Sequence, residues 1–258
     1  MNILNIKNCS IFYGDFQAVK NVSLSVRQGE ILSIVGESGS GKSTLLKAII
    51  GVLSKDNCSL KGEINFGSKN LITLNAKEWE TTRSHEIGMI FQSPDASFDP
   101  IKKIEPQFTE SIRVREPKKS TKACINIAKK MLKLLNLTDV DRVLSAYPFQ
   151  LSGGMKQRVS IAMAMDAKPQ LLLADEPTSA LDVTIQAQVV QQIKELKTKF
   201  NATVIIVTHN MGVASYISDS IAVMKDGEIV EYATRDEVIY HPKTEYTKEL
   251  LSAVPSVD

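Results

Sequence analysis

The chain has 258 residues, of which 43% are hydrophobic and 23% charged, and its formal net charge is +2 at pH 7. This composition is typical of a globular protein with a large buried core, and so small a net charge does not indicate a nucleic-acid partner. Because the chain nowhere has about 18 apolar residues in a row, we expect no membrane-spanning helix, and the N-terminus lacks the apolar core of a signal peptide.

The N-terminal segments 3–12 and 22–26 alternate apolar and polar residues, as half-buried strands do. We expect two antiparallel strands here. A tyrosine, Tyr13, follows the first segment within Phe12-Tyr13-Gly14. Taken alone, such a tyrosine is more often a packing residue than a platform for a base.

An apolar run, Ile31 to Val35, leads into GESGSGKST (residues 36–44) and then into further apolar residues. This pattern predicts a phosphate-binding loop between a strand and a helix. Glycines let backbone amides face the phosphates, Lys42 neutralises the β and γ oxygens, and the hydroxyl of Ser43 can bind Mg²⁺. The sequence therefore predicts a nucleoside-triphosphate site. Its predicted phosphate-binding residues are Gly36, Ser38, Gly39, Ser40, Gly41, Lys42, Ser43 and Thr44.

This loop has two other interpretations. A dinucleotide fingerprint, G-x-G-x-x-G, is excluded because residues 39–44 lack its final glycine and contain a lysine. A plain Gly/Ser-rich surface turn does not account for the strand pattern before the loop and the helical pattern after it.

The middle of the chain, about residues 93–151, is expected to be helical. Six apolar residues there recur at helical spacing, which is typical of an amphipathic helix. They are Cys124, Ile127, Ala128, Met131, Leu134 and Leu135. The lysine-rich run 118–122 is interpreted as the solvated start of this helix.

Next comes LSGGMKQR, residues 151–158, ahead of a helical run. Ser152 can cap that helix, and with Gly153 and Gly154 it presents backbone amides at the positive end of the helix dipole. Because the chain already has one phosphate loop, we hypothesise that this second anion site serves a nucleotide bound to another subunit. The alternative is an ordinary capped helix.

A second buried strand, Leu171 to Ala174, ends in Asp175 and Glu176. Ligands of parallel sheets bind at the carboxyl ends of the strands, so we expect Asp175 to hold Mg²⁺ and Glu176 to polarise an attacking water. Two solvated carboxylates are the alternative. Two more core strands are expected over 204–207 and 221–224, and a helix carrying Ile185, Val189, Ile193 and Leu196 should pack on the sheet.

Several motifs stand in a recognisable order along the chain: residues 36–44, Gln92, residues 151–158, LLLADEP at 171–177, SALD at 179–182, and His209 after a β pattern. Together they resemble the nucleotide-binding subunit of ABC transporters. The resemblance implies an α/β fold, with a P-loop NTPase core, an N-terminal antiparallel β subdomain and an inserted helical subdomain at about 93–165, in one domain over 1–258.

The same resemblance implies roles for individual residues. Gln92 would sense the γ-phosphate and Mg²⁺, Asp182 would line the interface between two ATPase subunits, and His209 would contact the γ-phosphate as a switch. Tyr13 would stack on adenine. The implied cofactors are ATP and Mg²⁺, and the implied activity is ATP hydrolysis coupled to import.

Further motifs resemble the dipeptide, oligopeptide and nickel importer group. They are Gln92-Ser93-Pro94, residues 97–100, Tyr147-Pro148, residues 184–188, and the ending formed by 241–247 and 250–255. Peptide and nickel or metal-chelate importers share them. An ending without a cysteine-containing tail, together with Tyr147-Pro148-Phe149, favours nickel slightly.

The resemblance also implies partners: a second ATPase subunit, identical or paralogous, transmembrane permease subunits that contact residues 92–100 and the helices after them, and indirectly an extracytoplasmic binding protein. The chain would lie peripherally on the cytoplasmic face of the membrane, and its three separated cysteines fit a reducing cytosol. Nucleic acid is not an expected partner. An ABC-type ATPase acting on DNA or ribosomes is the alternative, but it would normally carry a long coiled coil or a second copy of the motifs.

Overall fold

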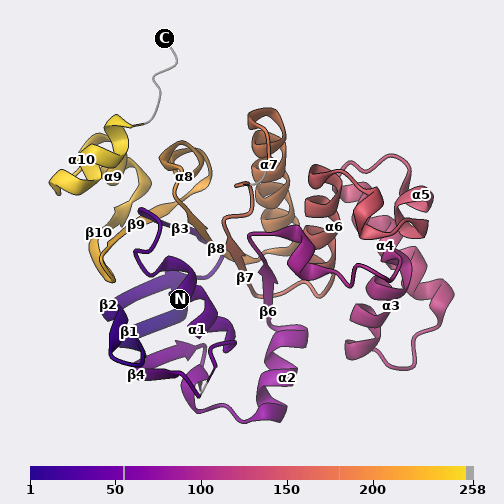
Figure 1. The fold of residues 1–258 in the computed structure, drawn as a ribbon, viewed down its shortest axis with the longest axis horizontal. Coiled ribbons are helices and arrows are strands. Elements are labelled where there is room, and N and C mark those ends of the chain that lie inside the picture. The colour runs from indigo at the N-terminus through magenta and orange to yellow at the C-terminus, as the bar shows by residue number, and fades with distance from the viewer. Residues whose placement is uncertain (55, 180, 254–258) are drawn as a thin grey trace. The chain divides into compact units, whose positions relative to one another are not determined.

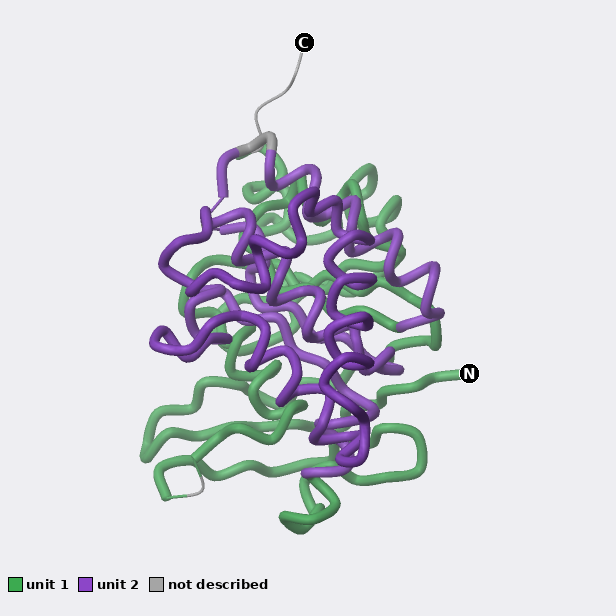
Figure 2. Tube along the Cα trace, turned by 90° about the vertical axis from the view of Figure 1, so that its right-hand side faces the viewer, with its two compact units in different colours: residues 1–79, 203–258 green, residues 80–202 purple. Residues whose placement is uncertain are grey.

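The computed structural model describes residues 1–54, 56–179 and 181–253 (Figure 1). Its backbone divides into two compact units (Figure 2): unit 1 comprises residues 1–79 and 203–258, and unit 2 comprises residues 80–202. Among the described residues, no helix combines the length and the apolarity that crossing a bilayer requires. Both units carry parts of the predicted site.

Unit 1 begins with an antiparallel sheet in the order β2-β1-β4-β5. Its strands are β1 (Asn2–Tyr13), β2 (Phe16–Arg27), β4 (Cys58–Phe66) and β5 (Lys69–Asn70). The predicted antiparallel pair is confirmed as β1 and β2, with Leu4 opposite Val26. Strand β4 was not predicted. Its apolar residues alternate with polar ones, but Gly62 interrupts the pattern and only Ile64 and Phe66 near its end are buried.

The second layer of unit 1 is built on β3 (Ile31–Val35), which pairs in parallel with both β8 (Thr203–Thr208) and β9 (Ser220–Lys225). All residues of β3 and β8 are buried, which explains their largely apolar sequences. An unpredicted strand, β10 (Glu228–Thr234), pairs antiparallel with β9. The helical elements are α1 (Lys42–Ile50), η1 (Leu71–Thr73), α8 (Met211–Ile217), α9 (Arg235–Tyr240) and α10 (Glu245–Ser252).

Unit 2 contains the parallel strands β6 (Ile87–Ile90) and β7 (Leu171–Asp175) and a largely helical segment between them. The helical elements of this unit are η2 (Pro94–Ser97), α3 (Ile104–Arg115), α4 (Thr121–Leu134), α5 (Val140–Ser145), η3 (Pro148–Gln150), α6 (Gly153–Asp166) and α7 (Val183–Phe200). Helix α2 (Ala76–His85) contains the boundary between the units. Strand β6 was not predicted, because it has only four residues and includes Gly88.

The amphipathic helix predicted for the middle of the chain is confirmed as α4. The hydroxyl of Ser120 caps it by accepting from the Ala123 amide, and the lysine-rich run before it is interpreted correctly as a helix start. Cys124, Ala128 and Met131 are buried on one face. The predicted helix carrying Val189, Ile193 and Leu196 is likewise confirmed as α7, with these three side chains buried.

Candidate functional site

The predicted phosphate loop connects β3 to α1 in unit 1, as expected. A Cβ atom at Gly36 would lie 2.1 Å from the carbonyl oxygen of Met224 in β9. At Gly41, where φ is 100°, a Cβ atom would lie 2.5 Å from the carbonyl oxygen of Ala18 in β2. Only glycine fits at these two positions, because the loop passes directly against neighbouring backbone before it turns into α1.

Lys42 is the first residue of α1 and is only 4% exposed. Its ammonium donates to the carbonyl oxygen of Glu37 at 2.6 Å and to the hydroxyl oxygen of Ser40 at 3.1 Å. Burying an ammonium is costly unless such bonds compensate. The loop therefore holds its lysine inside the curve that the backbone makes, where an anionic ligand of the loop would meet it.

The carboxyl ends of the strands in unit 1 bring the loop close to the predicted switch residue. Val35 pairs with Thr208 in the parallel register of β3 and β8, so Gly36 and His209 both lie immediately beyond the carboxyl-terminal edge of these strands. His209 is exposed, and the residue after it, Asn210, donates its amide to the hydroxyl of Thr208 at 3.0 Å.

In unit 2, parallel pairing brings two predicted catalytic residues into contact. Ile90 pairs with Ala174, and Gln92 and Glu176 each lie two residues beyond that pair. The amide of Gln92 donates to a carboxylate oxygen of Glu176 at 3.1 Å. Glu176 has a φ of 42°, in the left-handed region that non-glycine residues rarely adopt. Such backbone strain is concentrated at functional sites.

This arrangement defines what the carboxylate of Glu176 can do. An oriented carboxylate at a strand end can accept a proton from a water molecule that it holds by a hydrogen bond. The predicted metal-binding residues, Ser43, Gln92 and Asp175, all offer oxygen, and the Asp175 side chain is 6% exposed. A hydroxyl, an amide and one carboxylate suit Mg²⁺, which usually combines one or two carboxylates with phosphate and water oxygens.

The LSGGMKQR segment forms the start of α6, and the predicted cap is confirmed. The hydroxyl of Ser152 accepts from the Met155 amide at 3.3 Å. Ser152 and Gly153 are exposed, whereas a Cβ atom at Gly154 would lie 3.1 Å from Ile185 in α7. The first residues of α6 are thus accessible to an anion, and their contact with a nucleotide of another subunit stays a prediction.

Two further predicted binding residues lie in accessible positions. Asp182 is exposed and caps α7 by accepting from the Ile185 amide at 3.0 Å. Tyr13 is 38% exposed at the end of β1 and lines an open cavity of about 530 Å³. Their roles at a subunit interface and against adenine stay predictions. Ala180 of the SALD motif, and Val254 and Pro255 of the group-specific ending, lie outside the described residues.

The segment after Gln92 is tied to α6, the helix that the signature begins. The ammonium of Lys156 contacts the carboxylate of Asp95 at 2.6 Å, and the hydroxyls of Ser97 and Ser160 are 3.0 Å apart. Movement of α6 would therefore displace the segment after Gln92, and movement of that segment would displace α6. Two short side-chain contacts thus tie the segment that follows Gln92 to the signature helix.

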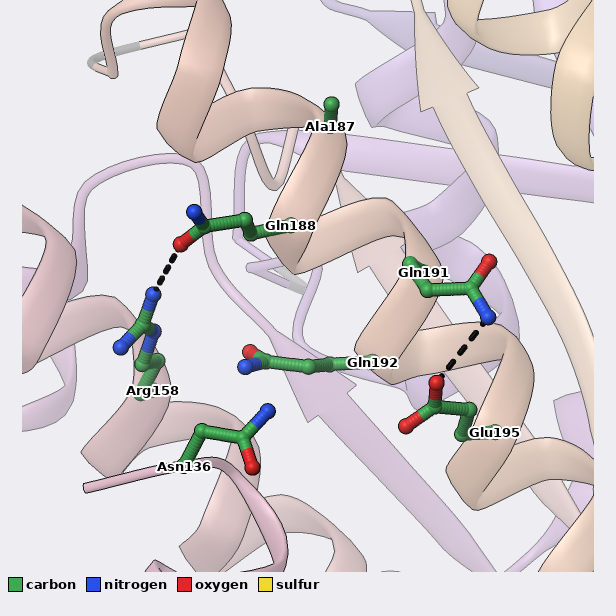
Figure 3. A pocket seen from close by; sticks show the side chains of 7 residues that line it. All are labelled: Asn136, Arg158, Ala187, Gln188, Gln191, Gln192 and Glu195. Atoms are coloured by element: carbon green, nitrogen blue, oxygen red, sulfur yellow. Dashed lines mark hydrogen bonds between the residues drawn. The ribbon is translucent and has the colours of Figure 1, made fainter. Parts of the chain in front are cut away.

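A polar pocket of about 580 Å³ in unit 2 contains none of the predicted ATP-site residues (Figure 3). Arg158, the last residue of the signature, donates there to Gln188 of α7 at 2.6 Å. The amide of Gln192, which is 3% exposed, donates to the carbonyl oxygen of Leu135 at 3.1 Å. The end of the signature thus fastens α6 to α7, while Ser152 and Gly153 near its beginning are exposed. The pocket is lined by Asn136, Arg158, Ala187, Gln188, Gln191, Gln192 and Glu195.

Two functional contacts were not predicted. Tyr246 hydrogen-bonds the phosphate loop through the Glu37 amide, although its sequence signal was only its place in the group-specific ending. Buried Gln107 organises the chain after Gln92, because it donates to the carbonyl oxygens of Asp99 and Lys102 and accepts from the Asp99 amide. A lone glutamine in a helix gives no signal of such a role.

The parallel strands, the loop with its buried lysine and the oriented glutamate define a P-loop protein that binds and hydrolyses nucleoside triphosphate. Comparison with known proteins identifies the family. A family model described as ABC transporter matches residues 19–179. The chain belongs to this family and is an ATP-hydrolysing ATP-binding cassette, as the motifs predicted.

Relatives of known role match nearly the whole chain. The dipeptide transport ATP-binding protein DppD of Lactococcus lactis is 40% identical over 99% of this chain and 74% of its own length. The oligopeptide transport ATP-binding protein AmiE of Streptococcus pneumoniae is 45% identical over 93% of this chain and 68% of its own. The oligopeptide transport ATP-binding protein OppD of Bacillus subtilis is 42% identical over 99% and 73%, respectively.

The fold is also that of a solved cassette. A dimeric structure of an ATP-binding cassette in a post-hydrolysis state, bound to ADP and Pi, matches with a TM-score of 0.79 and 32% sequence identity. The match covers 90% of this chain and 98% of that one. The predicted α/β fold, with a P-loop core, an antiparallel β part and inserted helices, is confirmed.

Proposed function

We propose that this chain is the ATP-binding and ATP-hydrolysing subunit of an importer for peptides. The observation that carries the proposal is the phosphate loop with Lys42 buried inside it, in a chain that also holds the Gln92–Glu176 pair. Peptides are favoured as the cargo because the relatives described above are named for dipeptide or oligopeptide transport. The slight preference of the sequence for nickel finds no support in these names.

The proposed division of labour follows the geometry of each unit. Residues 36–44 hold the phosphates, with Lys42 as the cation, and Tyr13 stacks on the adenine. Ser43, Gln92 and Asp175 bind Mg²⁺, which when bound neutralises phosphate charge. Glu176 holds and polarises the attacking water, oriented by its hydrogen bond from Gln92. His209, exposed beyond β8, contacts the γ-phosphate.

The second proposed component is another ATPase subunit. The exposed start of α6 offers backbone amides and a helix dipole to an anion, and Ser152 caps it. A nucleotide on a partner chain can use this site, while Asp182 lines the interface. The dimeric state of the matched cassette supports this arrangement. Whether the partner is identical or a paralogue stays open.

The third proposed component is a permease in the membrane, which would place this chain peripherally on the cytoplasmic face. Its contact is proposed on unit 2. There the Ile104 amide donates to the carbonyl oxygen of Ala146 at 3.0 Å, so the segment before Ile104 lies near the segment after Ala146. Ile101 on one segment is 82% exposed and Phe149 on the other is 71% exposed. Exposed apolar side chains of this size favour a protein partner. An extracytoplasmic binding protein would deliver the cargo to that permease.

Replacing Gly154 by aspartate is expected to block ATP-driven dimerisation and leave ATP binding by the monomer nearly unchanged. A carboxylate there would repel the phosphates of a partner's nucleotide, and its Cβ would press on Ile185. Size-exclusion chromatography with Mg²⁺ and ATP measures dimerisation, and a nucleotide titration of the monomer is the control. Loss of ATP binding in the isolated monomer would contradict the shared-site hypothesis for this chain.

Transport in reconstituted vesicles tests the cargo. The chain is combined with its partner ATPase, permease and binding protein, and uptake of labelled dipeptides, longer peptides and Ni²⁺ is measured with and without ATP. We expect ATP-dependent uptake of at least one peptide class and no uptake of free Ni²⁺. Uptake of Ni²⁺ or a nickel chelate without any peptide would overturn the peptide proposal and favour the alternative cargo of the importer group.

A further inference from the structure

Helix α10, in the C-terminal part of unit 1, reaches the phosphate loop. The hydroxyl oxygen of Tyr246, in the first turn of α10, accepts a hydrogen bond from the Glu37 amide at 3.1 Å. The carbonyl oxygen of the same residue, Glu37, accepts from the ammonium of Lys42 at 2.6 Å. One loop residue is thus held from two sides, by the tyrosine on its amide and by the lysine on its carbonyl.

The tyrosine ring is itself firmly placed. Tyr246 is 7% exposed and belongs to a core cluster that includes Val35, the last residue of β3, and Val223 of β9. The ammonium of Lys225 lies 4.5 Å from the centre of its ring, close enough for a cation–π contact. Burial raises the pKa of the phenol above its usual value, so Tyr246 is neutral at physiological pH. The packing of the ring therefore holds the hydroxyl oxygen in one position, where it accepts the hydrogen bond from the Glu37 amide.

The start of α10 is anchored by one buried carboxylate. Glu231 of β10 is 7% exposed and accepts from the backbone amides of Lys243 and Thr244 at 2.9 and 3.2 Å, and from the hydroxyl of Thr247 at 2.7 Å. Thr244 in turn caps α10. Burial alone would raise the pKa of Glu231, but the hydrogen bonds from Thr247, Lys243 and Thr244 outweigh it and hold that pKa below its usual value. The carboxylate stays ionised and fixes the first turn that carries Tyr246.

We propose that Tyr246 is a positioning residue for the phosphate loop. Its hydroxyl fixes Glu37, and Glu37 holds the ammonium of Lys42 inside the loop before nucleotide arrives. A loop that is ordered in advance loses less conformational freedom when it binds phosphate. This inference rests on the proposed ATP binding at residues 36–44 and extends it, because it makes helix α10 part of the nucleotide site.

Tyr246→Phe tests the proposal, because it removes the hydroxyl and keeps the ring that packs in the core. Loss of one neutral hydrogen bond is expected to raise both the Kd for ATP and the KM roughly 3- to 10-fold. The kcat should stay within about 2-fold of the original, since bound phosphate orders the loop in both proteins. In the nucleotide-free protein, amide hydrogen exchange of residues 36–41 should become faster.

The matched control is Tyr232→Phe. Tyr232 lies on β10 in the same unit, and its hydroxyl donates to the carbonyl oxygen of Ser25, outside the phosphate loop; the substitution removes that bond. Binding is titrated with Mg-ATP on the full chain, and turnover is measured in whichever assembly the original protein hydrolyses ATP. An unchanged or lower Kd in Tyr246→Phe, or the same increase in both variants, would overturn the proposal. Failure of the unsubstituted chain to bind ATP would instead refute the proposed function.

Discussion

Glu176→Gln is expected to bind ATP as the original chain does and to turn it over roughly 10²-fold more slowly, or slower still. The substitution keeps size and shape, and the new amide oxygen can still accept from Gln92, which now donates to the carboxylate at 3.1 Å. Only the charge and the basicity are lost. Because these act on the attacking water in the transition state, turnover falls and affinity does not.

Bound ATP should then keep two subunits closed, since the reaction that opens them is blocked. Size-exclusion chromatography with Mg²⁺ and ATP measures the dimer, and a phosphate-release assay measures turnover, using the partner subunit if it is distinct. Glu195→Gln is the matched control, because Glu195 is an exposed glutamate of unit 2 on α7, outside the predicted site. Near-normal hydrolysis, with Glu176→Gln at every active site, would move the catalytic role elsewhere, and His209 is the next candidate.

Lys42→Ala is expected to weaken ATP binding by roughly 10²-fold or more and to abolish measurable turnover at ordinary ATP concentrations. The ammonium is the loop's cation, and it already lies among the loop oxygens of Glu37 and Ser40. Without it, the loop offers the β and γ phosphates no side-chain cation. A nucleotide titration measures the affinity directly.

The matched control for this variant is Lys47→Ala. Lys47 lies in the last turn of the same helix, α1, where its own side chain is exposed. It should leave ATP affinity nearly unchanged, and thermal unfolding of both variants separates a binding effect from a folding effect. An affinity for ATP that survives in Lys42→Ala would show that the phosphate loop has been misassigned.

Much of the site could be predicted from the sequence alone. The phosphate loop, the buried strands on either side of the site, the start of α4 and the cap of α6 were all predicted, because each depends on residues close together in the chain. A glycine at which an added Cβ atom would lie 2.1 Å from neighbouring backbone, a serine three residues before the helix amide that it caps, and an unbroken apolar run each carry their own physical signal. The family motifs are made of such local signals.

Strands β4, β6 and β10 were harder to predict. Few residues of β4 and β10 are buried, Gly62 interrupts the alternation of β4, and β6 has only four residues, so the local signal of each strand is weak. Hydrogen bonding to a neighbouring strand places them instead. Pairing of that kind depends on the partner strand, which a local pattern does not contain.

Sequence by itself thus determined the chemistry that the chain carries: the phosphate loop, the carboxylates after β7 and the signature at the start of α6. Tertiary structure alone decided which of these groups meet. The parallel register of β6 and β7 brings Gln92 to Glu176, and the anchoring of α10 by Glu231 brings Tyr246 to Glu37, which lies 209 residues away in the chain. Contacts over such separations depend on strand register and helix docking, and these are set by the packing of the whole unit rather than by the residues that meet.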